Sequence, residues 1–310
     1  MLHINEIELF DSPRKNILPL LGDLQGEPEM SVEESAFLCG LIKKYTPKKI
    51  VEVGIAGGGT TAIILECIKE LNLKNVEMHS IDIEEYFYRN NNLKSGFLGT
   101  RAKDITKYNV NHTFHYGKVA CAYNDILEKT DFLILDTTHS MPGELLDFLT
   151  LLPVLKDGAV VVLHDISYSH ISEFDIWCDK TATSNLFATV VAEKYINYLN
   201  KNNYANIGAF IIDDNTKKYI SNVFLSLMIN WSYWLDENQV LEYRKCIANN
   251  YDNNLLNLFN SAIKYNNDSI NIKRISIYKD EQKIEKMKRL NLYLMERNLK
   301  LRKEMNNLNR

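Results

Sequence analysis

Apolar positions along the chain recur with two different periods, one typical of helices and one typical of buried strands. The segment MSVEESAFLCGLIKKY (30–45) begins with Ser31 followed three residues later by Glu34, and apolar residues then recur at helical spacing. Serine followed by glutamate three residues on is the capping-box pattern, in which each side chain bonds to the backbone N–H of the other residue. The pattern predicts a helix over about residues 32–45.

Short apolar or β-branched segments then alternate with helical patterns. Five of them end in Gly or Asp: KIVEVG (49–54), VEMHSID (76–82), HTFHYG (112–117), FLILD (132–136) and AVVVLHD (159–165). Continuous apolar strands separated by helices are typical of a parallel sheet covered on both faces. FATVVAEKY (187–195) and NIGAFIID (206–213) predict two more strands, the second a candidate antiparallel edge. We therefore predict a doubly wound α/β fold with a seven-stranded, mostly parallel sheet.

The pattern divides the chain into four parts: a lead-in (1–30), the sheet domain (31–213), a helical extension (214–270) and an amphipathic tail (279–310). In the tail, apolar residues fall on alternating three- and four-residue steps, with asparagines at two further positions of the seam: Ile284, Met287, Leu294, Leu301, Met305, Leu308, Asn291 and Asn298. This stepping is typical of a coiled coil. The tail predicts either self-association into a homo-oligomer or one long amphipathic helix lying on its own domain.

Composition changes this picture little. A net charge of −4 over 310 residues offers no argument for binding nucleic acid or an anionic membrane through bulk electrostatics. The five cysteines are odd in number and include no C-x-x-C pair, which favours free thiols in a reducing compartment. No segment approaches the roughly 18 apolar residues needed to span a bilayer, and the N-terminus lacks the pattern of a secretion signal. We expect a cytoplasmic protein without a membrane span.

The stretch VEVGIAGGGTT (51–61) is the strongest single signal for ligand binding. In an open α/β sheet the first strand-to-helix turn carries the glycines, and ligands bind at the carboxyl ends of the strands. The missing side chains of Gly54, Gly57, Gly58 and Gly59 allow the backbone to approach a ligand closely. The phosphate-loop pattern G-x-x-x-x-G-K-[ST] is absent, which excludes nucleotide triphosphate hydrolysis. A dinucleotide site remains an alternative, because Gly54, Ala56 and Gly59 fit G-x-A-x-x-G.

Two acidic residues favour a different ligand. Glu52 lies two residues before Gly54, where a carboxylate can meet a cationic amino-acid group, and Asp82 ends the second strand, where it can accept hydrogen bonds from both ribose hydroxyls. Such charge-assisted bonds contribute roughly 1.5–3 kcal/mol each. The pair indicates a nucleoside that bears an α-amino acid rather than a pyrophosphate.

With these residues the sequence resembles the class I S-adenosylmethionine-dependent methyltransferases, whose first motif has the form E-x-G-x-[GA]-x-G. The resemblance runs from about Met30 to Ile212. LILDTTHS and VVLHDIS are similar to the sugar O-methyltransferase and cephalosporin-hydroxylase-like group. The resemblance implies that the methionine part of the cofactor contacts Glu52 and the turn, that the ribose contacts Asp82, and that the adenine lies near the turn after the third strand. The implied turn residues are Gly54, Ala56, Gly57 and Gly58, followed by Gly117 and Lys118.

Four ionisable residues end or follow the fourth and fifth strands. They are Asp136, His139, His164 and Asp165, and in a parallel sheet these strand ends lie at the same edge as the glycine turn. By resemblance, His139 in the D-x-x-H spacing is the general base, and Asp136 and Asp165 hold Mg²⁺ or another divalent metal. His164, a further candidate metal ligand, departs from the family pattern, in which metal-dependent members carry Glu or Asp at this place. An imidazole suits a transition metal better than Mg²⁺. His79, His112 and His115 are expected to have structural roles.

The leading hypothesis is therefore an S-adenosylmethionine-dependent O-methyltransferase that acts on a hydroxyl of a sugar, a glycan or another small polar acceptor. Two alternatives stay open. One is an NAD(P)-dependent oxidoreductase using the same turn, although no Tyr-x-x-x-Lys pair follows it. The other is a non-catalytic methyltransferase-fold subunit that docks a partner enzyme through its tail. The acceptor cannot be read from the sequence; a role in polysaccharide biosynthesis is what the resemblance suggests.

Overall fold

The computed structural model describes residues 4–5, 7–22, 30–107, 110–171, 180–197 and 205–268. The predicted coiled-coil tail (279–310) lies outside the described residues, and so does Cys178. The chain divides into two units, Met1–Asn260 and Ser261–Arg310, and the described residues 261–268 of the second unit are helical. All the elements that follow belong to the first unit.

The first predicted helix has the predicted bounds. Helix α2 covers Val32–Tyr45, and Ser31 is its N-cap. Ser31 Oγ accepts a hydrogen bond from Glu34 N at 3.2 Å, and Glu34 Oε2 accepts one from Ser31 N at 2.6 Å. Both halves of the capping box are therefore present, and two backbone donors at the helix start are satisfied.

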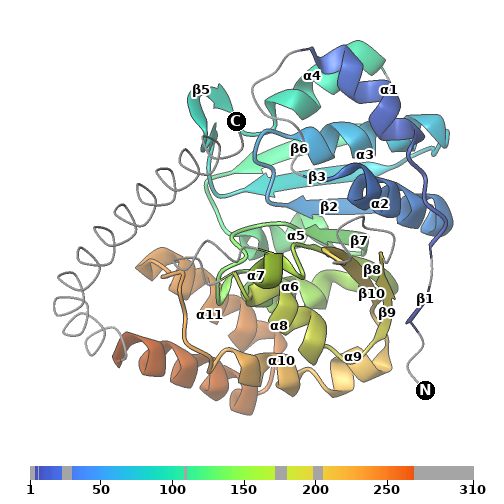
Figure 1. Cartoon of the computed structure of the whole chain (residues 1–310). Helices are drawn as coiled ribbons and strands as arrows, with labels where there is room; N and C mark the ends of the chain where they lie inside the picture. Colours follow the sequence, from blue (N-terminus) through green and yellow to red (C-terminus); the bar gives the residue numbers. More distant parts are fainter. Residues whose placement is uncertain are drawn as a thin grey trace, which may run out of the picture. The chain divides into compact units, whose positions relative to one another are not determined.

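A mixed sheet forms the centre of this unit (Figure 1). Its strand order is β1-β9-β10-β8-β7-β2-β3-β6. The strands cover, in chain order, Ile4–Asn5 (β1), Lys49–Val53 (β2), Glu77–Asp82 (β3), Asn111–Tyr116 (β6), Thr130–Leu135 (β7), Leu155–His164 (β8), Glu193–Ile196 (β9) and Ile207–Ile211 (β10). The strands from β8 to β6 in this order are parallel, and β10 is antiparallel to both β8 and β9. The prediction of a doubly wound, mostly parallel sheet is confirmed, with the short β1 as an additional strand.

Helices cover both faces of the sheet, as the continuous apolar strands require. Figure 1 shows α1, α2, α3 and α4 on one face and α6, α8, α10 and α11 on the other. The helices not yet bounded cover Ser12–Leu21 (α1), Gly59–Glu70 (α3), Phe97–Thr106 (α4), Asn124–Leu127 (α5), Gly143–Leu151 (α6), Tyr168–Ile171 (α7), Ala182–Thr189 (α8), Asp214–Lys218 (α9), Ser221–Ser226 (α10) and Glu237–Asn250 (α11), with short 3₁₀ turns at Ala120–Tyr123 (η1) and Leu152–Val154 (η2). The central strands β2, β3, β7 and β10 are almost entirely buried between these layers.

Three details differ from the sequence prediction. The first half of the predicted strand 187–195 belongs to helix α8, which packs on the sheet so that Phe187 lies against Gly208 of β10. Strand β10 is antiparallel, as expected, but it lies between β8 and β9 instead of at the edge. A hairpin of β4 (Tyr86–Phe87) and β5 (Asn90–Lys94) follows β3, and its polar sequence, NNNLK, carries no alternating pattern that would predict a strand.

The described cysteines, Cys39, Cys67, Cys121 and Cys246, are free and buried. Of the helices that the structure describes, none combines the length and the apolarity needed to cross a membrane.

Candidate cofactor and catalytic site

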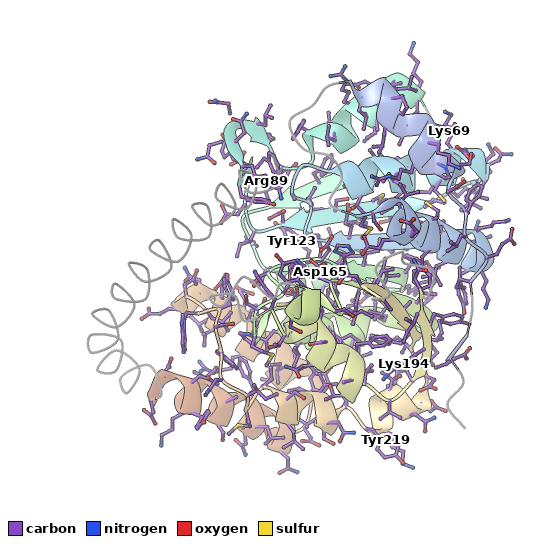
Figure 2. The ribbon with its side chains drawn as sticks, viewed as in Figure 1. Lys69, Arg89, Tyr123, Asp165, Lys194 and Tyr219 are labelled. Carbon is purple, nitrogen blue, oxygen red and sulfur yellow. The ribbon has the colours of Figure 1, made fainter. Side chains whose placement is uncertain are left out.

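A cavity of about 530 Å³ opens at the carboxyl ends of the parallel strands. Its lining includes the turn after β2, the end of β3, the turn after β6 and the loops after β7 and β8, together with residues of the β4–β5 hairpin and of α11. Figure 2 shows two of these lining residues on separate elements, Arg89 on the hairpin and Asp165 at the end of β8. The cavity lies where an open α/β sheet binds its ligands.

The glycine turn has a backbone path that side chains would block. Gly54 has φ +91°, and a Cβ built on it would lie 1.8 Å from the carbonyl oxygen of Asp136. Gly58 has φ +84°, and its Cβ would lie 2.7 Å from the Cα atom of Gly96, before α4. Gly54, Ala56 and Gly57 line the cavity, whereas Gly58 is absent from its lining. The small size of Gly58 therefore allows close packing against the start of α4.

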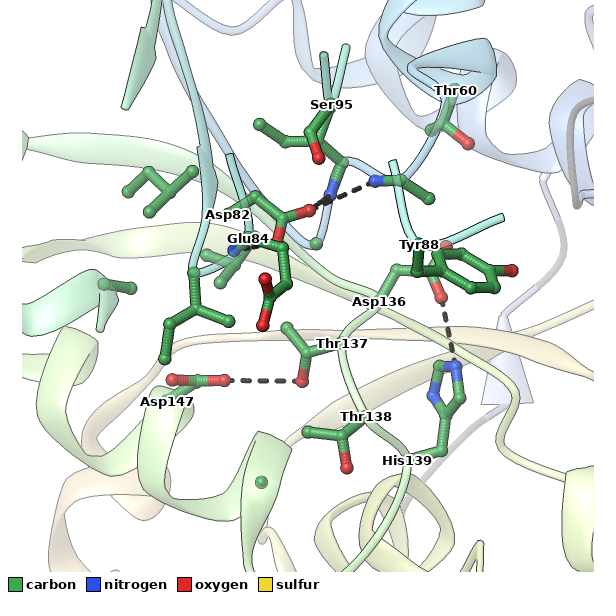
Figure 3. A pocket seen from close by; sticks show the side chains of 18 of the residues that line it. Thr60, Asp82, Glu84, Tyr88, Ser95, Asp136, Thr137, Thr138, His139 and Asp147 are labelled. Carbon is green, nitrogen blue, oxygen red and sulfur yellow. Dashed lines mark hydrogen bonds and ion pairs between the residues drawn. The ribbon is translucent and has the colours of Figure 1, made fainter. Parts of the chain in front are cut away.

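Asp82 organises the turn from the end of β3. Its Oδ2 atom accepts hydrogen bonds from the backbone N–H groups of Ile55 at 2.9 Å and Ala56 at 3.2 Å, and its Oδ1 atom accepts one from Glu84 N at 2.9 Å (Figure 3). The carboxylate also lines the cavity. Asp82 thus holds the turn in place and still presents lone pairs to a ligand.

Glu52 does not lie where the sequence places it. The side chain is 1% exposed and is absent from the cavity lining, whereas its neighbour Val53 is part of that lining. Successive residues of a strand point to opposite faces, so the side chains of Glu52 and Val53 lie on opposite faces of the sheet. Glu52 accepts hydrogen bonds from Thr61 Oγ1 at 2.7 Å and Ser80 Oγ at 2.6 Å. Burial raises the pKa of Glu52 to about 7, although the bonds from Ser80 and Thr61 act in the opposite direction.

Glu52→Gln tests this position. We expect the affinity for S-adenosylhomocysteine to stay within about threefold of wild type, because one lost charge-assisted bond would cost tenfold or more. The folded pKa of about 7 exceeds the unfolded value, so the ionised carboxylate destabilises the fold as pH rises from about 4 to 7. Because the variant has no carboxyl to ionise, its free energy of unfolding should fall less than that of wild type between pH 4 and pH 8. Calorimetry and thermal unfolding at pH 4 and pH 8 measure both effects.

The matched control is Glu66→Gln, since Glu66 is also a buried glutamate and lies on α3 outside the cavity lining. A tenfold or larger loss of affinity in Glu52→Gln but not in the control would restore the assignment of Glu52 to the cofactor.

Three of the predicted catalytic and metal-binding residues come together at the ends of β7 and β8. Among the described residues, Asp136, His139 and Asp165 form a group that could hold a metal ion, with ligand atoms within 4.8 Å of one another. His139 Nε2 lies 3.1 Å from Asp165 Oδ2 and 3.6 Å from Asp136 Oδ1. All three residues line the cavity, and Figure 3 shows His139 directed toward Asp136.

Glu144 positions His139, and the sequence did not single it out. Its Oε1 atom accepts hydrogen bonds from the backbone N–H of His139 at 2.7 Å and of Thr137 at 3.2 Å, and it lies 3.1 Å from His139 Nδ1. Burial alone would lower the pKa of His139, but the contact with Glu144 and the charges of Asp136 and Asp165 raise it to about 8. The available signal was an acidic residue at the start of a mostly apolar helix, a pattern that helix capping also explains.

His164 is buried next to this group and does not line the cavity. Its Nδ1 atom is 3.2 Å from Asp136 Oδ1, and its Nε2 atom is 3.5 Å from Glu34 Oε2. Burial opposes the charged form, but the neighbouring carboxylates outweigh it and raise the pKa of His164 well above its usual range. The imidazole of His164 lies against the carboxylates of Asp136 and Glu34, and the structure does not group it with the three candidate metal ligands.

The other predicted residues are divided between the cavity and its surroundings. Lys118 lines the cavity beside Val119 and Ala120, whereas Gly117 does not. Gly117 has φ +80°, and its N–H donates a hydrogen bond to the carbonyl oxygen of Asp82 at 3.1 Å. The predicted structural histidines also lie outside the lining: His79 pairs with His115 at 2.9 Å, and His112 with Ser80 at 3.0 Å.

Comparisons with known proteins found one matching family model and several similar solved structures. Residues 51–166 match a family model described as a methyltransferase domain. The fold is similar to the O-methyltransferase TomG from Streptomyces achromogenes (15% identity, 67% of this chain and 92% of that chain, TM-score 0.46) and to an O-methyltransferase from Bacillus cereus (14%, 66% and 92%, 0.45). It is also similar to the methyltransferase PaMTH1 from Podospora anserina (10%, 67% and 91%, 0.48). No curated protein is a significant match.

Proposed function

We propose that the chain is an S-adenosylmethionine-dependent O-methyltransferase, because residues 51–166 match a family model described as a methyltransferase domain. The observation that carries the proposal is one cavity lined by the glycine turn, Asp82 and the group of Asp136, His139 and Asp165. The turn and Asp82 suit the amino-acid and ribose parts of the cofactor, and the group of three supplies what a hydroxyl acceptor needs. The similar O-methyltransferases from Streptomyces achromogenes and Bacillus cereus were crystallised with S-adenosylmethionine and S-adenosylhomocysteine, respectively.

The proposed reaction is an in-line displacement. The acceptor oxygen forms a bond to the methyl carbon as the bond from that carbon to the sulfonium sulfur breaks, and S-adenosylhomocysteine leaves. Holding the two reactants in line can supply roughly 7–11 kcal/mol of the barrier. His139 Nε2, which faces the two aspartates in the cavity, would accept the hydroxyl proton. A positioned base typically adds about 10²–10⁴ in rate.

A divalent metal fits the two aspartates of this group. The carboxylates of Asp136 and Asp165 offer ligand atoms within 4.8 Å of one another, and carboxylate oxygens suit Mg²⁺ or Mn²⁺. When bound, such a metal acidifies an oxygen that it ligates and offsets the charge that keeps His139 protonated. Asp136 and Asp165 would hold the metal, and Glu144 would orient His139 through its Nδ1 atom.

We place the acceptor on the His139 side of the cavity and propose a hydroxylated, polar molecule such as a sugar or glycan. Tyr168 stacks on His139 with 6.1 Å between ring centroids, and Lys180 Nζ donates a hydrogen bond to the carbonyl oxygen of Thr138 at 2.6 Å. Both residues, together with Tyr88 from the hairpin, line the cavity. Aromatic faces combined with hydroxyl, ammonium and carbonyl groups can bind a polyol by stacking and hydrogen bonding.

Calorimetry with S-adenosylhomocysteine, followed by transfer of a labelled methyl group to a panel of sugars and nucleotide sugars, tests the proposal. We expect saturable binding of S-adenosylhomocysteine and no binding of NAD(H). Transfer should be measured after chelation and again after Mg²⁺ or Mn²⁺ is added back. Folded protein that binds NAD(H) and not S-adenosylhomocysteine would overturn the proposal. If chelation leaves methyl transfer unchanged, the proposed metal site is wrong and the proposed methyl transfer stands.

A further inference from the structure

A buried carboxyl lines the cavity away from His139. Asp147 on α6 is 6% exposed and lines the cavity, as does Tyr243 on α11, which is 5% exposed. Tyr243 Oη donates a hydrogen bond to Asp147 Oδ1 at 3.1 Å, and Thr137 Oγ1 donates one to Asp147 Oδ2 at 3.4 Å. Figure 3 shows Asp147 and Thr137 directed toward each other, apart from His139.

The strand order tells which part of the cavity Asp147 occupies. Helices α6 and α11 both pack against η1, the turn that follows edge strand β6, and Ala120 of η1 lines the cavity. Strand β3, which ends in Asp82, lies between β6 and β2. The cavity therefore runs from the group at the ends of β7 and β8, past Asp82, to a region enclosed by η1, α6 and α11. A ligand whose ribose contacts Asp82 and whose sulfur lies near His139 must place its base in this last region.

Among the described residues, no ion pair joins Asp147, and its two hydrogen bonds come from hydroxyl groups. Burial, and then the charge of Glu144, raise the pKa of Asp147 to about 7, while the bonds from Tyr243 and Thr137 act in the opposite direction. Each carboxyl oxygen keeps a lone pair for a further donor, and leaving a buried acceptor unsatisfied costs free energy. The cavity side of Asp147 therefore calls for a hydrogen-bond donor from the ligand.

We infer that Asp147 recognises the base of the cofactor by accepting a hydrogen bond from the exocyclic amino group of adenine. Tyr243 is a positioning residue, because its hydroxyl fixes the carboxyl from α11. The inference rests on the proposed function and deepens it. It assigns recognition of the base to α6 and to the helical extension, whereas the resemblance pointed to Gly117 and Lys118 in the turn after β6.

The helical extension is thereby part of the cofactor site, and its attachment to the catalytic loop supports this. The backbone N–H groups of Ser232 and Tyr233 both donate to the carbonyl oxygen of Met141, two residues beyond His139. Gln239 Nε2 then donates to Tyr233 Oη at 3.0 Å, at the start of α11. These bonds hold α11 where Tyr243 can reach Asp147.

The test compares S-adenosylhomocysteine with S-inosylhomocysteine, in which a carbonyl oxygen replaces the amino group. Calorimetry on wild type should show a preference of about 10–100-fold for the adenosine compound, the range expected when a buried polar group loses its partner. Asp147→Asn can turn an amide N–H₂ toward the carbonyl, so the preference should fall at least about tenfold. Tyr243→Phe should lower the preference by a smaller factor, and the control Asp125→Asn, an exposed change on α5, should leave it unchanged.

Each outcome decides between the two proposals. If wild type binds S-adenosylhomocysteine without preferring it, or if Asp147→Asn keeps the wild-type preference, the inference is wrong and the proposed function stands. If wild type binds neither compound, the proposed function falls and the inference with it. Should Asp147→Asn fail to fold, Tyr243→Phe decides, and an unchanged preference in that variant overturns the inference.

Discussion

Asp82→Ala should raise the dissociation constant for S-adenosylhomocysteine by about 10²–10⁴, because two charge-assisted hydrogen bonds to the ribose contribute roughly 3–6 kcal/mol together. The loss has a second source in the same carboxylate. Asp82 accepts the N–H groups of Ile55 and Ala56, so its removal leaves the glycine turn without the bonds that fix its path. Calorimetry of the purified variant measures the effect directly.

Asp131→Ala is the matched control, because Asp131 plays a similar backbone role at the opposite end of the strands. Its carboxylate accepts hydrogen bonds from the N–H groups of Lys48 and Lys49. The control should lose stability comparably and keep the wild-type affinity. Equal affinities in the Asp82 variant and in wild type would show that the ribose does not contact this residue.

The elements predicted from the sequence are those in which local pattern and burial agree. The capping box of α2 and the apolar runs of β2, β3, β7 and β8 are short-range signals, and the structure contains all of them. Helix α8 was mistaken for a strand because Phe187, Ala188 and Thr189 are apolar or β-branched residues, and Phe187 packs against Gly208 of β10 from a helix. Periodicity over so few residues does not distinguish the two.

The site divides in the same way. Residues that belong to a contiguous motif, such as the glycine turn and Asp136 with His139, were predicted from their spacing, and the structure brings Gly54, Asp136 and His139 to one cavity. Tyr243 contacts Asp147 across 96 positions of sequence, and no local pattern marks either residue. Glu52 shows the opposite case. Its place in the motif predicted a contact with the cofactor, but its side chain is buried and absent from the cavity lining.

His139→Ala should lower the turnover number by about 10²–10⁴, measured with the acceptor that the transfer panel identifies, because the variant lacks the group that accepts the hydroxyl proton. The dissociation constant for S-adenosylhomocysteine should stay within about threefold of wild type, since the imidazole faces Asp136 and Asp165 and not the glycine turn. A loss of turnover without a loss of cofactor binding is the result expected of a base. A purely structural histidine would lose both together, because Glu144, which holds its loop, would be left without a cationic neighbour.

His115→Ala separates the chemistry from the general cost of losing an imidazole. His115 is partly buried on β6 and paired with His79, and it lies outside the cavity lining, so its removal should leave turnover within about twofold of wild type. If the His139 variant turned over as fast as this control, the proton would have to leave by another route, and the assignment of His139 as the base would be wrong. The two aspartates could then still serve a metal, since their carboxylates converge in the cavity without requiring the imidazole as a base.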